Sequence, residues 1–233
     1  MRRLARAVRF VGGSTLRFVA WRLGPATPAR RRAHFSAWAR WLLAVLGVRV
    51  ARRGTAPEPP CLLVANHVSY LDVVVLAAET GAVFVAKGEV SRWPWIGLLA
   101  RGIGTIFVDR GRRSDLVRVN GEISAALDRG EGVVVFPEGT STDGSHVVAF
   151  KTGLLEEAAR RGIPVRPARI RYDAPSVAWW GEMEFLPHLW DLFAISSIEC
   201  DLDLTLAPVV ATDRKALAEA LHDRIASPWR AAS

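Results

Sequence analysis

From Cys61 onward, short apolar runs alternate with stretches of helical composition. The runs with the length and the Val, Ile and Phe content of strands are 61–65, 82–86, 105–108, 133–136, 165–172 and 198–206. The helix-like stretches between and after them are 71–79, 95–101, 115–129, 154–161 and 213–225. Strands that alternate with helices are joined by crossovers, which place the strands parallel and the helices on the faces of the sheet. The pattern therefore predicts an α/β fold with a mostly parallel sheet flanked by helices.

The N-terminal segment differs in composition from the rest of the chain. Thirteen of the 31 basic residues, all of them Arg, and none of the 23 acidic residues fall within residues 1–57. Large apolar side chains interleave with these Arg, which is typical of helices that lie in a membrane interface and not of a nucleic-acid-binding tail. Ordinary surface helices packed on the domain are the alternative. The turn-rich GTAPEPP stretch predicts a boundary, with amphipathic membrane-associating helices in 1–56 and the α/β domain in 57–233.

The sequence gives little indication of a disulfide, a metal site, a signal peptide or a membrane-spanning helix. Cys61 and Cys200 are far apart and lie in apolar runs, so we expect core residues and not a disulfide or metal pair. The five His are scattered, and no metal site is predicted. Arg interrupts every long apolar stretch near the N-terminus, so neither a signal peptide nor a spanning helix is expected. Arg favours an anionic leaflet, which predicts peripheral or monotopic attachment to the cytoplasmic face of the inner membrane.

The stretch VANHVSYLDVVVL, residues 64–76, places polar residues inside an apolar segment. Burying His and Asp side chains costs free energy unless each has a partner. His67 and Asp72 would lie on different faces of one helix, but they can meet if the helix starts between them. Ser69 is a suitable N-cap, and the Asp72 carboxylate can reach back to it. His67 then lies in the loop after a strand, at the edge where open α/β sheets bind ligands.

The residues of this cluster allow two interpretations. Ser69 and Asp72 can form only a capping box, with His67 a satisfied loop residue. Alternatively, His67 is a general base whose tautomer Asp72 fixes. The chain has no Gly-x-Ser-x-Gly motif to supply a serine nucleophile, so such a base would act on a hydroxyl or water that the substrate brings.

Three further stretches place candidate binding residues beside predicted strands. GTIFVDR ends in Arg110, which can hold an anion. VVVFPEGTSTDG leaves a strand into Glu138, Gly139 and Thr140. Gly139 allows close approach of the backbone, and Thr140 offers a hydroxyl and an amide to an oxyanion. RGIPVRPARI enters a strand through two prolines.

In combination and order, these stretches resemble the signature blocks of the glycerolipid acyltransferases, the family that contains 1-acylglycerol-3-phosphate acyltransferase. NHVSYLD is similar to the family's Asn-His-x4-Asp block, GTIFVDR to Gly-x-x-Phe-x-x-Arg, FPEGT to the third block and IPVRP to the fourth. FKTG, at residues 150–153, also follows as it does in the family. The blocks span residues 62–172, about half of the chain.

The resemblance implies an activity and roles for these residues. His67 would take the proton from the free hydroxyl of a lysolipid, while Asp72 orients and charges the imidazole. The alkoxide would then attack the thioester of an acyl-CoA or acyl-carrier protein, which are co-substrates, and no cofactor is expected. The expected substrate-binding residues are Arg110, Glu138, Gly139, Thr140, Lys87, Gly104 and Phe107. The expected acceptor is 1-acyl-sn-glycerol-3-phosphate, which would give phosphatidic acid.

One departure from the family pattern bears on the acceptor. The third block commonly continues with an Arg that is expected to contact the acceptor phosphate, but this chain has Ser141 there. A hydroxyl cannot replace a bidentate phosphate contact. EGTSTDG, followed by a Trp-rich segment, is similar to the branch that acylates lyso-ornithine lipid, which is the alternative acceptor. The Trp-rich segment, residues 173–193, is interpreted as a flap over the core, a wall for an apolar ligand or a second membrane contact.

Two other classes of function compete with acyl transfer. A hydrolase could use the same His67 to activate water on a thioester or lipid ester. A non-catalytic lipid-binding protein would not need His67. The expected partners are membrane lipids, the lysolipid acceptor and the acyl donor, and nucleic acid is not among them.

Overall fold

The computed structural model describes residues 1–25, 27–94, 96–109 and 111–230. Within these residues, seven strands form one sheet in the order β1-β7-β6-β2-β5-β3-β4. Their bounds are β1 Val48–Arg53, β2 Cys61–Ala65, β3 Val83–Lys87, β4 Ile106–Val108, β5 Gly132–Val135, β6 Val165–Tyr172 and β7 Ile198–Asp203. Every neighbouring pair is parallel except β6 and β7, which are antiparallel. The predicted α/β fold with a mostly parallel sheet is confirmed.

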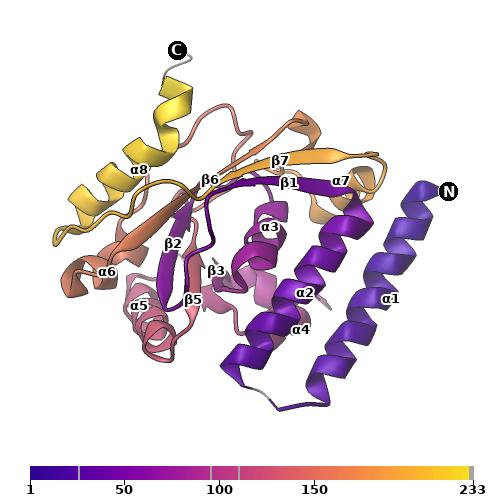
Figure 1. The fold of residues 1–233 in the computed structure, drawn as a ribbon, viewed down its shortest axis with the longest axis horizontal. Helices are drawn as coiled ribbons and strands as arrows, with labels where there is room; N and C mark the ends of the chain where they lie inside the picture. Colours follow the sequence, from indigo (N-terminus) through magenta and orange to yellow (C-terminus); the bar gives the residue numbers. More distant parts are fainter. Residues whose placement is uncertain (26, 95, 110, 231–233) are drawn as a thin grey trace.

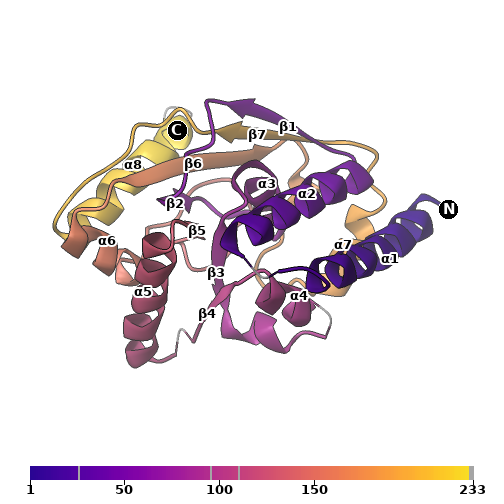
Figure 2. The same ribbon diagram turned by 60° about the horizontal axis from the view of Figure 1, so that its bottom comes forward.

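Helices cover both faces of the sheet (Figures 1 and 2). Their bounds are α1 Arg2–Arg22, α2 Pro28–Leu46, α3 Leu71–Thr80, α4 Ile96–Gly102, α5 Arg113–Asp128, α6 Glu156–Arg161, α7 Phe185–Leu192 and α8 Arg214–Arg230. One core packs α2, α3 and α7 against the sheet, and a second core packs α5, α6 and α8 against the opposite face. The central strands β2 and β5 are buried along their whole length, because apolar helices cover both sides of them.

Two elements before residue 56 share the first of these cores. In α2, buried side chains such as Phe35, Leu42 and Leu46 belong to the same cluster as the buried residues of α3. The unpredicted strand β1 pairs in parallel with β7, with Val48 opposite Ile198. Its sequence, VRVARR, contains three Arg, which suits an edge strand that is mostly exposed.

The first helix, α1, packs on α2 through small residues. A Cβ on Gly13 would lie 2.3 Å from the Trp41 ring, so glycine permits this close approach. The indole N–H of Trp38 donates to Oγ of the buried Ser14 over 3.0 Å. The Arg17 guanidinium stacks 4.3 Å from the Trp41 ring centroid. None of the helices in the described part of the chain combines the length and hydrophobicity that crossing a bilayer requires.

The Trp-rich segment folds back against α1. The guanidinium of Arg3 lies 3.2 Å from an Asp191 carboxylate oxygen and 6.0 Å from the Trp190 ring centroid. Arg6 donates to the Phe193 carbonyl oxygen over 3.3 Å, and the Phe10 and Phe193 rings lie 6.0 Å apart. Segments that are far apart in the sequence, α1 and α7, therefore lie side by side (Figure 2).

Candidate active site

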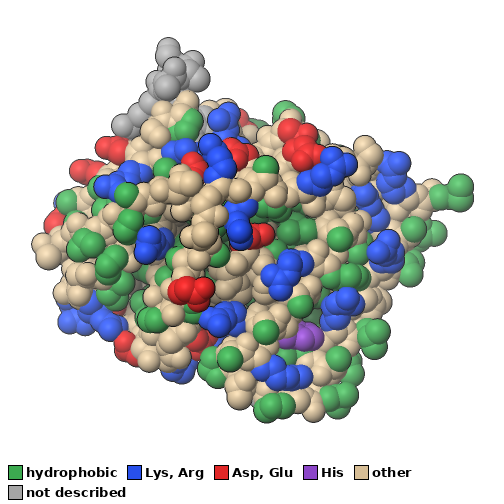
Figure 3. Space-filling model, in the orientation of Figure 1, with side chains coloured by type: hydrophobic (Ala, Val, Ile, Leu, Met, Phe, Trp, Pro, Cys, Tyr) green, Lys and Arg blue, Asp and Glu red, His purple; other side chains and the backbone are tan. Residues whose placement is uncertain are grey.

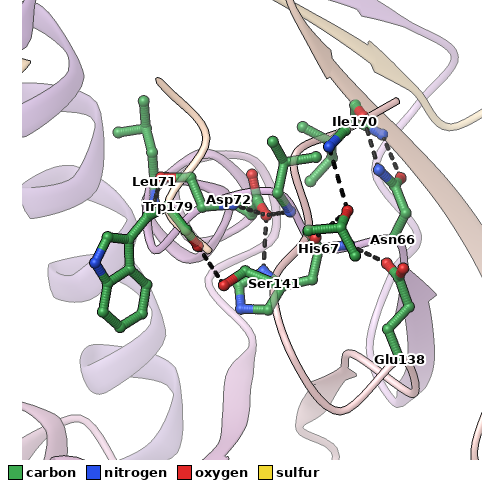
Figure 4. Close-up of polar contacts among 12 residues, drawn as sticks. Asn66, His67, Leu71, Asp72, Glu138, Ser141, Ile170 and Trp179 are labelled. Atoms are coloured by element: carbon green, nitrogen blue, oxygen red, sulfur yellow. Dashed lines mark hydrogen bonds and ion pairs between the residues drawn. The ribbon is translucent and has the colours of Figure 1, made fainter. Parts of the chain in front are cut away.

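The parallel strands bring the predicted site residues to one edge of the sheet. The strands β2, β3, β4, β5 and β6 share one direction, so their carboxyl ends meet at the same edge. His67 follows β2, Lys87 ends β3, and Tyr172 ends β6. Figure 4 shows the polar contacts around His67.

His67 and Asp72 meet as predicted, because α3 begins between them. The Nδ1 atom of His67 lies 2.8 Å from Oδ2 of Asp72, which sits in the first turn of α3. The same Oδ2 accepts the backbone N–H groups of Val68 over 2.7 Å and Ser69 over 3.0 Å. The prediction that Ser69 is the N-cap is wrong: Tyr70 occupies that position without a side-chain cap. The predicted reach of the Asp72 carboxylate back to Ser69 is confirmed, and its two backbone contacts fix the shape of the loop before α3.

This geometry sets the tautomer of His67. A carboxylate can only accept, so the Nδ1 atom of the ring carries the proton that Asp72 receives. The ring stacks on Phe136, with centroids 4.1 Å apart and planes 17° apart. The side chain is 18% exposed, and no hydrogen bond to Nε2 is found within the described residues. Nε2 is thus left as a lone-pair acceptor, which is the arrangement a general base needs.

Tyr172 is a site residue that the sequence analysis missed. Its O–H donates to Oδ1 of Asp72 over 2.7 Å, so both oxygens of this fully buried carboxylate are hydrogen-bonded. Burial, together with the Asp72 charge, raises the pKa of Tyr172 well above its usual value, which keeps the phenol a donor. Its place at the carboxyl end of β6 is the signal that could have identified it.

Asn66 joins the His67 loop to the neighbouring strand. Its Nδ2 donates to the Ile170 carbonyl oxygen over 2.9 Å, and its Oδ1 accepts the Ile170 N–H over 2.9 Å (Figure 4). The side chain, 2% exposed, thereby replaces a backbone pairing just beyond the end of β2. Asn66 therefore helps to hold His67 at the sheet edge.

Glu138 is expected to hold the polar head of the acceptor, but its side chain points away from the cavity. Its side chain is 2% exposed, and its two oxygens accept backbone N–H groups of His67 over 2.6 Å and Val148 over 2.9 Å. The carboxyl is thus occupied in fixing the His67 loop to the third block, and it does not line the cavity described below. Burial raises the pKa of Glu138 to about 7.

The Glu138 pKa predicts a pH dependence of stability. In the folded protein the pKa is about 7, above the ordinary value of 4.5, so the folded state holds a proton that the unfolded chain loses. The free energy of unfolding therefore falls as the pH rises from about 4.5 to 7, by on the order of 3 kcal/mol from this group. We expect Glu138→Gln to remove this part of the dependence in urea unfolding curves recorded at several pH values. Equal pH slopes for the two proteins would show that Glu138 does not bind a proton on folding.

His67 lies at the wall of a largely apolar cavity of about 350 Å³. The lining comes mainly from α2, α3, β3, α4 and the Trp-rich segment, so it combines segments that are far apart in the sequence. Representative lining residues are Phe35, Trp38, Leu42, Val74, Phe84, Leu99, Trp179 and Phe185. The Trp-rich segment thus forms a wall of the cavity, one of the three interpretations of its sequence. A hydrocarbon chain placed there would end beside the imidazole.

Of the remaining predicted substrate-binding residues, some line the cavity and others do not. Lys87 and Thr140 are exposed and line the cavity. Gly139 has a φ of +76°, and a Cβ there would lie 2.7 Å from the Lys151 ammonium, so glycine is needed in this turn. Gly104 and Phe107 are not among the lining residues.

Arg110 lies outside the described residues. Ser141 lines the cavity, and its hydroxyl donates to the Trp179 carbonyl oxygen (Figure 4). This hydroxyl therefore ties the third block to the Trp-rich wall.

Comparisons with known proteins agree with this geometry. Residues 47–171 match the protein family described as Acyltransferase. The chain is 36% identical over 202 residues to a lyso-ornithine lipid O-acyltransferase of Brucella abortus, covering 78% of this chain and 76% of that protein. It is 31% identical over 211 residues to a 1-acyl-sn-glycerol-3-phosphate acyltransferase of Neisseria gonorrhoeae, covering 85% and 81% of the two chains. The crystal structure of PlsC, the 1-acyl-sn-glycerophosphate acyltransferase of Thermotoga maritima, has the same fold, with a TM-score of 0.68, 20% identity and coverage of 100% and 98%.

Proposed function

This chain belongs to the acyltransferase family, and from that premise we propose that it transfers a fatty acyl group to the free hydroxyl of a lysolipid. The strongest support for this proposal is the position of the His67 ring. Asp72 holds its Nδ1 proton at 2.8 Å, and the ring lies at the wall of an apolar cavity of about 350 Å³. A base at the end of a hydrocarbon site suits a reaction between two lipid-like substrates.

The reaction follows from the orientation of His67. Nε2 removes the proton from the acceptor hydroxyl, and the Asp72 carboxylate stabilises the imidazolium that forms. The alkoxide oxygen attacks the thioester carbonyl carbon and gives a tetrahedral intermediate. Its collapse breaks the C–S bond, and the leaving thiolate takes the proton back from His67. The products are the new ester and free thiol, and the imidazole returns to its starting state. The donor is an acyl-CoA or acyl-carrier protein.

The acceptor that we favour is a lyso-ornithine lipid. The support comes from Ser141, which occupies the position where the family pattern has Arg. Its hydroxyl donates a hydrogen bond to the Trp179 carbonyl oxygen. The 36% identical relative from Brucella abortus is named for this acceptor. Lysophosphatidate is the second candidate, because the 31% identical relative from Neisseria gonorrhoeae is named for it and Lys87 lines the cavity.

The test is acyl transfer by the purified protein in mixed micelles. Radiolabelled palmitoyl-CoA and palmitoyl-carrier protein are each supplied with lyso-ornithine lipid or lysophosphatidate. Labelled ornithine lipid as the main product supports the favoured acceptor. Labelled phosphatidate as the main product would identify lysophosphatidate as the acceptor. If neither acceptor gives a labelled lipid, the proposed function is contradicted.

We also propose that α1 seats the enzyme on the membrane. Exposed apolar side chains recur on its outer face with helical spacing, at Leu4, Val8, Val11, Leu16 and Val19, and Leu23 follows directly after the helix. A helix packed only on its own protein presents polar residues on that side. Hydrophobic and basic side chains are interspersed over α1 and α2 (Figure 3). The absence of acidic residues from 1–57 suits an anionic leaflet, such as the cytoplasmic face of the inner membrane.

The membrane-binding surface predicts the effect of polar substitutions on α1. The triple variant L4S/V8S/V11S should bind vesicles that contain phosphatidylglycerol at least roughly tenfold more weakly, because each buried aliphatic side chain contributes on the order of 1 kcal/mol. V117S/V210S is the matched control, since both residues are exposed valines outside α1. Co-sedimentation measures binding. Equal binding of the triple variant and the wild type would remove α1 from the membrane contact.

A further inference from the structure

The cavity beside His67 carries one cationic and one anionic side chain within the described part of its lining. These are Lys87, the last residue of β3, and Glu89, in the short 3₁₀ helix Gly88–Arg92 that follows. All other described lining residues are apolar or neutral polar, apart from His67 itself. The described lining therefore holds a pair of opposite charges in an otherwise largely apolar surface.

Neither of these side chains has a charged partner in the described structure. Both are exposed, and no described ion pair or hydrogen bond joins either one to another residue or to each other. The pair is thus available to a ligand that enters the cavity.

The distance of the pair from His67 suits the head group of an acceptor. β5 lies between β2 and β3 in the sheet, so Lys87 and Glu89 follow a strand two places from the one that leads into His67. Neighbouring strands are about 4.8 Å apart, which places the end of β3 roughly 10 Å from the end of β2. A lysolipid whose hydroxyl meets His67 would extend its polar head across this distance.

The charges of the pair select the chemistry of that head group. A phosphate monoester carries only negative charge, so Lys87 would attract it and Glu89 would repel it. A head group with one anionic and one ammonium group satisfies both side chains. The hydroxyl of Ser141, unlike an Arg, adds no further positive charge here.

Resting on the proposed function, we propose that Glu89 is a specificity-determining residue that binds the ammonium group of a zwitterionic lysolipid, while Lys87 binds its anionic group. Ornithine and ethanolamine head groups share this chemistry. Glu89 does not take part in proton transfer. Its removal should therefore change which lipid is acylated, and should leave the chemical step intact.

The experiment measures kcat/KM for three acceptors in the same micelles: lyso-ornithine lipid, lysophosphatidylethanolamine and lysophosphatidate. The proteins are wild type, Glu89→Gln, Glu89→Lys and, as a rescue, Glu89→Asp. Glu182→Gln is the matched control, because it removes the same charge from an exposed residue that does not line the cavity. Glu89 is exposed, so these variants should fold, which circular dichroism checks.

We expect Glu89→Gln to lower kcat/KM roughly tenfold or more for the zwitterionic acceptors, mainly through KM, because a hydrogen bond to a charged group is lost. Lysophosphatidate should be used as well as before or better, Glu89→Lys should strengthen this shift, and Glu89→Asp should restore much of the wild-type preference. The zwitterion that the wild type acylates faster identifies which head group the site holds.

Two results overturn the inference. Equal changes for all three acceptors, or none, would show that Glu89 does not contact the head group, while acyl transfer itself would stand. No transfer to any acceptor by the wild type, with either donor, would overturn the proposed function and the inference together.

Discussion

Replacing His67 by Ala should lower acyl transfer by roughly 10²- to 10⁴-fold, the range that general-base catalysis contributes. The effect should appear in kcat, because the side chain acts on the acceptor proton and contributes only one part of the cavity wall. Folding should survive, since the ring makes one described side-chain hydrogen bond, to Asp72, and one stacking contact, with Phe136. Initial rates with labelled palmitoyl-CoA and circular dichroism measure the two quantities.

His146 provides the matched control for this prediction. It is an exposed His in the loop that follows the third block, and it does not line the cavity. His146→Ala should keep the wild-type rate. A His67→Ala protein that keeps a rate within a few-fold of the wild type would exclude His67 as the base.

The second large effect is expected for Asp72→Asn. The substitution keeps the shape of the side chain, but it removes the charge that stabilises the His67 imidazolium and the acceptor that fixes the Nδ1 proton. In a Ser-His-Asp triad the same change costs about 10⁴-fold in kcat. We expect at least roughly 10²-fold here, because Asp72 also accepts from the Nδ1–H of the catalytic His.

Asp72→Asn should also destabilise the protein. The carboxylate accepts from Val68 N–H, Ser69 N–H and the Tyr172 hydroxyl, and an amide can accept through only one of its two terminal atoms. The free energy of unfolding should fall by about 1–3 kcal/mol, the cost of an unsatisfied buried group.

Asp173, an exposed residue that follows Tyr172 in the chain, supplies the control variant for Asp72→Asn. Asp173→Asn should change neither activity nor stability appreciably, because Asp173 accepts only from the Glu199 N–H among the described contacts and is exposed. Full activity of Asp72→Asn would mean that the pair is a structural contact only.

Local sequence patterns predict the centre of this fold well and its edges poorly. The buried runs of β2 and β5 are continuous in Val and Leu, so their composition alone indicates strands covered on both faces. The edge strand β1 is half Arg, and only its pairing with β7 makes it a strand. That pairing joins residues 48–53 to 198–203, which no local pattern can reveal. The turn-rich stretch after β1 predicts a boundary, but α2 and β1 pack in the same core as the later strands. This packing also depends on contacts between distant residues, which a local pattern does not reveal.

In the candidate active site, too, local contacts could be predicted from the sequence and long-range contacts could not. The spacing of His67 and Asp72 and a helix start between them were sufficient to predict their contact, because both lie within six residues. The partners of this pair come from distant blocks. Tyr172 reaches Asp72 only because β6 lies beside β2.

The family resemblance implies that Glu138 binds the acceptor, and its motif follows a strand at the same edge. The structure shows that its carboxyl turns inward, to the N–H groups of His67 and Val148. A motif locates a residue at an edge of the sheet, but the side-chain direction depends on which unsatisfied donors lie nearby.

The proposed mechanism requires His67 to deliver the acceptor's own hydroxyl, and not water, to the thioester. The most direct test follows the labelled acyl group when palmitoyl-CoA is incubated with the wild-type protein, with and without lyso-ornithine lipid. We predict that CoA is released at an appreciable rate only when the acceptor is present, and that the label appears in the ester of the diacylated lipid. CoA release at the same rate without acceptor, with the label in free palmitate, would contradict the claim and identify the protein as a hydrolase.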